Sequence, residues 1–138
     1  MKCAIPSSSH MLQRQTWLFV NDNTNIRWLK IFHLYKGFFR KKTFISFFVK
    51  GAAKVVEPPR LEYKGFKYKY NLKGDIARSI IVRSRFQTTY ADNATIRFNS
   101  NAGFILKKKF EPKSKFIQGP ITRTVFRKKL LSLFKVVI

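Results

Sequence analysis

The sequence predicts a mainly β protein, folded as a small β-barrel or sandwich, and its length fits one domain. Short runs of β-branched and aromatic residues recur along the chain, and turn-forming residues separate them. Helical periodicity is visible only near the C-terminal end. The 138 residues are 45% hydrophobic and 16% aromatic, so there is enough apolar surface for a buried core and little reason to expect disorder.

Three strands are expected in the first fifty residues, at 16–20 (TWLFV), 26–35 (IRWLKIFHLY) and 44–50 (FISFFVK). Each run is rich in β-branched and aromatic side chains and ends at a turn signal. These signals are residues 21–25 (NDNTN), Lys36-Gly37 and Gly51. Asp22 is expected to stabilise its turn through its own side chain rather than to act in catalysis.

The middle of the chain contains a two-faced ribbon at residues 66–73 (FKYKYNLK). Aromatic residues and a leucine alternate strictly with lysines and an asparagine, which puts apolar and cationic side chains on opposite faces of an extended segment. Residues 57–60 (EPPR) form a stiff extended break ahead of it.

Three further strands are expected at residues 76–84 (IARSIIVRS), 95–98 (TIRF) and 104–107 (FILK). A KGD turn at residues 73–75 precedes the first of them. The other two are joined by NSNAG at residues 99–103, which predicts a rigid hairpin over residues 96–106. Its outgoing strand runs into Lys107, Lys108 and Lys109, which we expect to face phosphate.

The last stretch changes to a helical period. After Gly119-Pro120, apolar residues Phe126, Leu130, Leu133 and Phe134 recur at i, i+4, i+7 and i+8, with basic residues between them. This pattern predicts a short amphipathic helix with a basic side. The helix could cap an open end of the barrel or bind a partner, and the two roles are compatible.

Positive charge is the main functional signal. The chain has 29 Lys and Arg against 6 Asp and Glu, a net charge of +23, and a compact chain repels itself at this charge unless a polyanion neutralises it. The aromatic content favours nucleic acid over an anionic membrane. The cations expected to bind phosphate at strand ends, at turns and on the ribbon are Arg27, Arg40, Lys41, Lys42, Lys67, Lys69, Arg83, Arg85, Arg97, Lys107, Lys108, Lys109, Lys113 and Arg123.

Catalytic and metal chemistry are not indicated. The carboxylates are scattered, His10 and His33 lack metal-ligand spacing, and no nucleotide-binding or nucleophile motif occurs. Cys3 alone cannot form an internal disulfide or a cysteine-built metal site. The most hydrophobic run, residues 44–49, is too short to span a bilayer. We therefore expect no enzyme activity, no cofactor and no membrane insertion.

From Met11 onward, an ordered series of short motifs resembles the large-subunit ribosomal protein fourteen family. The matches are MLQ at residues 11–13, Asp22-Asn23 with Arg27, Lys73-Gly74-Asp75 with IIVR at 80–83, IRF at 96–98 with Asn101-Ala102, Glu111-Pro112, Gly119-Pro120 with Arg123, and Ser132-Leu133. They follow one another in the family's order.

The resemblance implies a five-stranded β-barrel over residues 11–116, a C-terminal helical segment over 117–138 and an N-terminal extension at 1–10. A basic and aromatic insertion is expected at about residues 52–72 and is predicted to dock onto rRNA or a neighbouring ribosomal protein. The high basicity favours a ribosome of the mitochondrial matrix. The N-terminus lacks a transit-peptide pattern, which favours synthesis inside the organelle.

The resemblance also implies a role as a structural constituent of the large ribosomal subunit in translation. The expected place is the intersubunit face, bound to large-subunit rRNA beside ribosomal proteins of the three and nineteen families, with bridges to small-subunit rRNA. The family also offers a docking surface for a ribosome silencing factor. The positions matching the bridge and silencing-factor surface are Lys115, Phe116 and Lys129. Phe116 stands where the family has arginine, which puts that bridge contact in question.

Two other functions are compatible with the sequence. A free single-stranded nucleic-acid-binding module of OB type would require aromatic side chains exposed on the outer strands. A peripheral membrane protein would use residues 127–138 as a basic amphipathic anchor.

Overall fold

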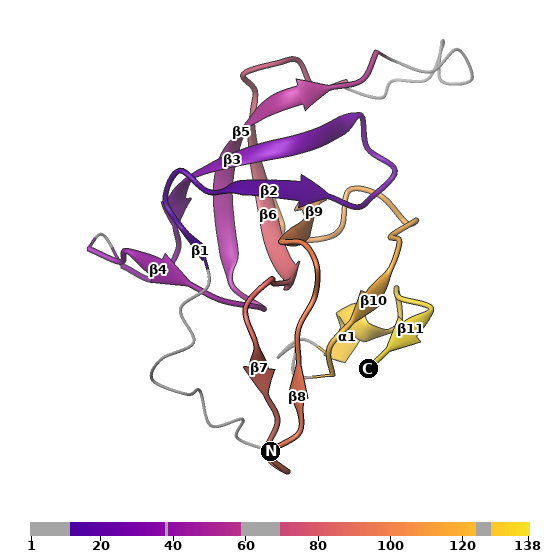
Figure 1. Ribbon diagram of the computed structural model, residues 1–138. Coiled ribbons are helices and arrows are strands. Elements are labelled where there is room, and N and C mark those ends of the chain that lie inside the picture. The colour runs from indigo at the N-terminus through magenta and orange to yellow at the C-terminus, as the bar shows by residue number, and fades with distance from the viewer. Residues whose placement is uncertain (1–11, 38, 59–69, 124–127) are drawn as a thin grey trace.

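A computed structural model describes residues 12–37, 39–58, 70–123 and 128–138 of the chain. Five strands form a closed barrel in the order β2-β3-β5-β6-β9 (Figure 1). They are β2 (Trp17–Val20), β3 (Ile26–Leu34), β5 (Phe48–Val56), β6 (Ile76–Arg83) and β9 (Ala102–Leu106). All neighbours are antiparallel except β2 and β9, whose parallel pairing closes the barrel. The five-stranded barrel implied by the family resemblance is confirmed.

Shorter elements lie around the barrel. β1 (Leu12–Gln13) pairs with β4 (Lys42–Thr43), and β7 (Thr88–Thr89) pairs with β8 (Thr95–Ile96) in a hairpin that extends away from the barrel (Figure 1). β10 (Pro120–Ile121) pairs in parallel with β11 (Val136–Val137), and α1 (Lys128–Leu131) lies between them in sequence.

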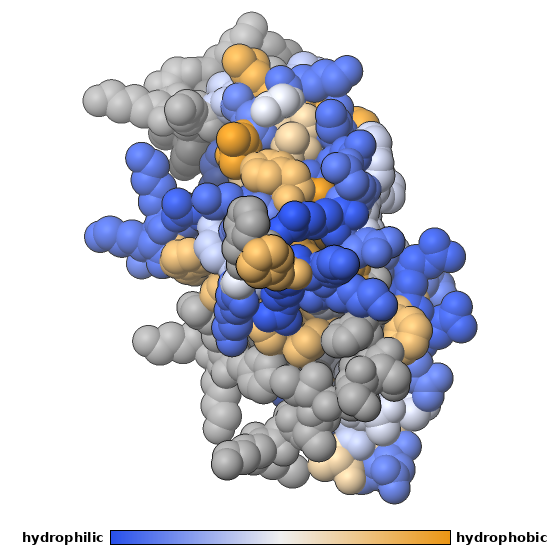
Figure 2. Space-filling model, turned by 90° about the vertical axis from the view of Figure 1, so that its left-hand side faces the viewer, coloured by the Kyte–Doolittle hydropathy of each residue, from blue (hydrophilic) through white to orange (hydrophobic). Residues whose placement is uncertain are grey.

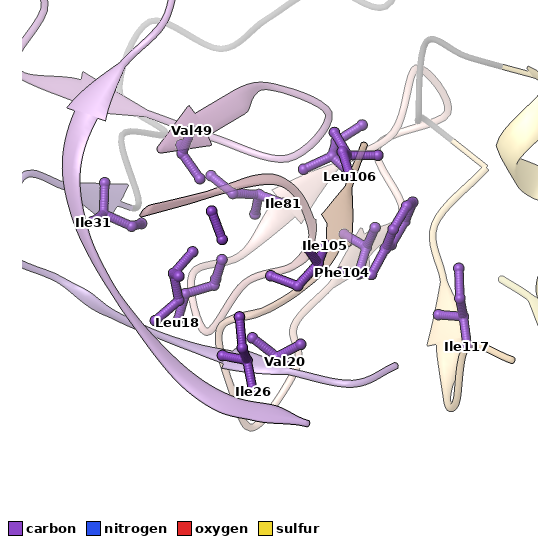
Figure 3. Packing of buried hydrophobic residues seen from close by; sticks show 14 of the residues in the cluster. Leu18, Val20, Ile26, Ile31, Val49, Ile81, Phe104, Ile105, Leu106 and Ile117 are labelled. Atoms are coloured by element: carbon purple, nitrogen blue, oxygen red, sulfur yellow. The ribbon is translucent and has the colours of Figure 1, made fainter. Parts of the chain in front are cut away.

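The core fills the inside of the barrel. Leu18 and Val20 of β2 and Ile26 and Ile31 of β3 point toward the side chains of β6 and β9 (Figure 3). Phe104 is fully buried, which contributes about 1.5–3 kcal/mol relative to an exposed side chain. Its ring centroid lies 6.1 Å from that of Phe134, so the C-terminal segment packs against the same core and covers one part of the barrel.

The third predicted strand is displaced along the chain. Residues 44–47 do not form part of a strand, and β5 runs through Gly51 instead of ending there. A Cβ at Gly51 would lie 2.6 Å from Cγ of Leu29 and 2.7 Å from the Lys30 carbonyl oxygen. This glycine therefore serves the close approach of β3, which explains why its interpretation as a turn was wrong.

The barrel wall thus includes residues 52–56, which the sequence analysis placed in the insertion. Residues 59–69 of that range, with Lys67 and Lys69, lie outside the described residues, as does the first half of the predicted ribbon. The part of the ribbon that is described, residues 70–73, is not a strand.

The predicted hairpin over residues 96–106 is wrong. β8 pairs with β7, whereas β9 pairs with β6 and β2. All five residues of β9 are buried, but neither residue of β8 is. Both edges of β9 are already paired, by β6 and β2, so no edge remains on which β8 could form a hairpin with it.

The predicted C-terminal helix is also too long. Among the described residues only Lys128–Leu131 are helical, and Phe126 lies outside them. Leu130 and Phe134 are buried, as the apolar spacing requires. After the helical turn, backbone bonds from Ile138 to Ile121 (2.8 Å) and from Arg123 to Ile138 (3.0 Å) hold the chain in an extended pair with β10.

A side-chain hydrogen bond extends the seam between β2 and β9. Backbone N–H groups of Phe19 and Asn21 donate to the carbonyl oxygens of Asn101 (3.0 Å) and Gly103 (3.1 Å). The next amide, that of Ile105, donates to Oδ2 of Asp22 at 2.8 Å. The carboxylate thus stands in for a backbone acceptor and extends the seam.

Asp22 also forms the turn that the sequence predicts, because its Oδ1 accepts from the Thr24 amide at 2.9 Å and from the Thr24 hydroxyl. Burial raises the pKa of Asp22, and the hydrogen bonds from Thr24 and Ile105 oppose that effect. The carboxylate therefore combines a local turn with a contact to a strand far away in sequence.

We expect Asp22→Asn to lower the free energy of unfolding by about 2 kcal/mol, because the buried Ile105 amide or the Thr24 pair would then face an N–H₂ group instead of an acceptor. Asp92→Asn is the matched control, since exposed Asp92 accepts from the Ala94 amide in a similar turn (3.2 Å). Denaturant unfolding followed by circular dichroism would measure both. Equal effects of the two substitutions would contradict a seam role for Asp22.

Candidate nucleic-acid interface

The predicted phosphate-binding cations differ in how far they reach solvent. Arg27, Arg40, Arg83 and Lys113 are partly buried, and Lys67 and Lys69 lie outside the described residues. The exposed members are Lys41, Lys42, Arg85, Arg97, Lys107, Lys108, Lys109 and Arg123. Hydrophilic side chains surround isolated apolar ones on the side of the molecule that carries β1 and β4 (Figure 2).

The connection from β3 to β4 holds one group of cations. Lys36 Nζ lies 4.8 Å from the Phe47 ring centroid, and Arg40 Cζ lies 4.3 Å from it. Nε of Arg40 also donates to the Lys42 carbonyl oxygen (3.0 Å). Cation–π contacts of this kind hold the Lys36 and Arg40 side chains against Phe47, and exposed Lys41 and Lys42 directly follow Arg40.

The turn after β9 holds the second group. The Lys107 backbone amide donates to the Glu111 carbonyl oxygen (2.7 Å), and the Phe110 amide donates to the Lys107 carbonyl oxygen (3.0 Å). Arg78 clamps the turn, because its Nη1 donates to the Lys108 carbonyl oxygen (2.7 Å) and its Cζ lies 5.4 Å from the Phe110 ring centroid. Lys107, Lys108 and Lys109 are exposed at the end of a barrel strand, as predicted, although that strand has different partners.

Arg27 forms an ion pair within the protein, with Glu57. Its Nε and Nη2 donate to the two carboxylate oxygens of Glu57, each at 2.7 Å, and Nη1 donates to the Asp22 carbonyl oxygen at 3.3 Å. The hydrogen bonds to Glu57 raise the pKa of Arg27. The pair ties the start of β3 to the end of β5, a contact that the sequence analysis missed because the partners are thirty residues apart.

Arg83 and Arg123 are positioned by the C-terminal part of the chain. A Cβ at Gly119, whose φ is +86°, would lie 1.8 Å from Nη1 of Arg83, so a larger residue would displace the guanidinium from this position. Burial lowers the pKa of Arg83. Arg123 Cζ lies 5.2 Å from the ring centroid of Tyr90, whose hydroxyl donates to the Ile138 carbonyl oxygen (2.7 Å).

The residues matched to the bridge surface come from two segments. Lys115 and Phe116 are exposed, Phe116 with 72% of its surface accessible. The Phe116 amide donates to the Ser114 hydroxyl oxygen at 3.2 Å, which shapes this turn. Lys129 lies in α1.

A surface that the sequence analysis did not single out lies on the outside of the barrel. Trp17 and Phe19 of β2 and Trp28 and Phe32 of β3 form what we call the outer aromatic face; Trp17, Trp28 and Phe32 are 45%, 37% and 41% exposed. The signal that could have found it is the alternation in TWLFV, which sends Leu18 and Val20 inward and the aromatic residues outward.

The described residues offer neither a membrane-spanning helix nor a metal site. None of their helices is long and apolar enough to cross a membrane. No group of three or more His, Cys, Asp or Glu in the same residues could hold a metal ion.

Comparison with known proteins agrees with the geometry. A family model described as ribosomal protein L14p/L23e matches residues 11–138. The chain is also similar to the large ribosomal subunit protein uL14m of Tetrahymena pyriformis, with 32% identity over 124 residues, which cover 90% of this chain and 97% of the relative.

Because Arg27 is paired with Glu57, we expect it to contribute to stability, whereas exposed Lys108 is expected to contribute to RNA affinity. We expect Arg27→Gln to lower the free energy of unfolding by about 0.5–1 kcal/mol, a value limited by solvent screening of a partly exposed pair. It should weaken RNA affinity less than Lys108→Gln, which in turn should leave stability unchanged. Unfolding curves and filter binding would measure the two effects. The assignment would be wrong if Arg27→Gln lost more RNA affinity than Lys108→Gln at unchanged stability.

Proposed function

The chain belongs to the ribosomal protein L14p/L23e family and is a structural constituent of the large ribosomal subunit, and we propose that it binds large-subunit rRNA there at the intersubunit face. Members of this family are structural components rather than enzymes, which agrees with the prediction from the scattered carboxylates. The observation that carries the proposal is the pair of exposed lysine groups, Lys41-Lys42 beside Arg40 and Lys107–109 on the turn that Arg78 clamps.

The binding mode follows from this arrangement. Lysines on fixed turns meet phosphates whose spacing is set by folded RNA, and release of counterions supplies affinity. Contacts to phosphate position a protein without reading bases. The barrel therefore acts as a rigid cationic block that holds RNA segments in place. Arg40, Arg83, Arg85, Arg97, Lys113 and Arg123 would add further contacts, with Arg27 in a supporting role.

We place the bridge to small-subunit rRNA, and the docking of a ribosome silencing factor, at Lys115, Phe116 and Lys129. The exposure of Phe116 supports an apolar or stacking contact in place of the arginine contact expected in the family. Neighbours of the three and nineteen families would contact other parts of the barrel. The similarity to uL14m supports a mitochondrial ribosome, and we propose in addition that the chain is synthesised inside the organelle and works in the matrix.

One alternative has an observation in its favour. A free OB-type module requires exposed aromatic residues on outer strands, and Trp17 and Trp28 meet that requirement. The membrane-anchor alternative has less support, since the described part of residues 127–138 contains one helical turn followed by an extended strand rather than an amphipathic helix.

The proposal predicts that a tagged copy of the chain sediments with the large ribosomal subunit of a mitochondrial lysate at high salt, together with large-subunit rRNA. Because many phosphate contacts act together in an assembled particle, brief exposure to salt should not release it. A peak at the top of the gradient, with mixed RNA or none, would favour the free OB-type module.

Salt dependence tests the phosphate contacts. If about 8 cations touch phosphates, the logarithm of RNA affinity should fall with the logarithm of salt concentration with a slope of about −6 to −7. Lys108→Gln with Lys109→Gln should make this slope shallower by about 1–2. Lys73→Gln with Lys135→Gln removes the same charge at two other exposed positions and should change it less. Equal slopes for both double variants would mean that only net charge matters.

A further inference from the structure

We propose that the outer aromatic face stacks unpaired bases of rRNA. The inference rests on the proposed rRNA binding and adds to it a second kind of contact, on the wall of the barrel and separate from the lysine turns. Its ligand is a single-stranded nucleotide whose base lies on Trp17 or Trp28.

The geometry of the face is fixed by strand register. Trp17 lies opposite Lys30, and Phe19 lies opposite Trp28, so these four side chains share the outer surface. The Trp28 ring centroid lies 6.3 Å from that of Trp17 and 5.4 Å from that of Phe19, with interplanar angles of 65° and 68°. Edge-to-face contacts hold the rings in place while leaving much of both tryptophans accessible. A base would thus meet an ordered platform.

Charge on this face favours RNA. Lys30 lies within the face, Lys50 and Lys54 follow on the adjoining strand β5, and β2, β3 and β5 contain no Asp or Glu. The first acid after β5, Glu57, is occupied by Arg27. Aromatic rings interleaved with lysines, and no carboxylate, are what single-stranded nucleic acid requires, because rings stack on bases while ammonium groups attract phosphates.

A protein partner would fit this face less well. Lysine is depleted in the centres of protein interfaces, since a buried ammonium costs free energy unless an acid of the partner pairs with it. Here Lys30 lies opposite Trp17, inside the aromatic group rather than at its rim. RNA supplies the counter-charge wherever it supplies a base. We therefore assign the face to RNA and treat a protein as a competing outcome.

The test uses the only two tryptophans of the chain, both of which lie on this face. Titration of the full chain with a short single-stranded oligoadenylate should quench their fluorescence to saturation. Inorganic polyphosphate of equal charge should bind, as judged by competition with labelled RNA, without quenching, because it has no base to stack. Bound oligoadenylate without quenching would overturn the inference and leave the proposed rRNA binding intact. Failure of the chain to bind any RNA would overturn both.

Variants separate stacking from general apolar contact. Trp17→Leu with Trp28→Leu should weaken oligoadenylate binding about tenfold, whereas Trp17→Phe with Trp28→Phe should retain most of the affinity. Phe86→Leu is the control, because Phe86 is 47% exposed and lies on no barrel strand. Circular dichroism would establish that each variant is folded. If the leucine variant bound RNA normally, but large subunits containing it lacked a neighbouring protein, the face would belong to a protein instead.

Discussion

The parallel contact between β2 and β9 is the interaction on which the rest of the barrel depends. Without it the five strands would form an open sheet with two unpaired edges and an uncovered apolar face. Gly103 of β9 allows the close approach of β6 on the other edge of this strand, because a Cβ at Gly103 would lie 2.4 Å from the Ile80 carbonyl oxygen. Asp22 extends it by accepting from Ile105. Asn21 joins the following segment to the same seam by exchanging hydrogen bonds with Gln118.

A closed barrel explains how so small a protein tolerates so much positive charge. Its turns are held by contacts that involve few of the cationic side chains. Arg40 lies against Phe47, and Arg78 lies against Phe110 and donates to the Lys108 carbonyl oxygen. The exposed lysines on these turns then keep their ammonium groups available to a polyanion. Repulsion among them destabilises the free protein, and a bound polyanion removes that repulsion and stabilises the fold by mass action. Folding and assembly are therefore coupled through electrostatics.

Local patterns in the sequence predicted local structure well. The runs that became β2, β3 and β6 stand between unambiguous turn residues, and the turn at Asp22 follows from the preferences of aspartate. Pairing over long distances was not predictable in the same way. The separation between residues 98 and 104 suggested a hairpin, but burial of all five residues of β9 assigned that strand to the barrel. The amphipathic pattern after Gly119 correctly marked Leu130 and Phe134 as buried, although pairing with β10 shortened the helix.

The long reach of the closing seam has a consequence for how the chain folds during synthesis. Asp22 and Ile105 are 83 residues apart, so β2 and β3 leave the translating ribosome well before β9 exists. Until then the edge of β2 remains unpaired and the apolar side chains of the growing sheet stay in contact with water. Contacts between residues so distant in sequence form slowly. Barrel closure is therefore a late event in folding, and the interval before it is when the nascent chain is most exposed to aggregation and proteolysis.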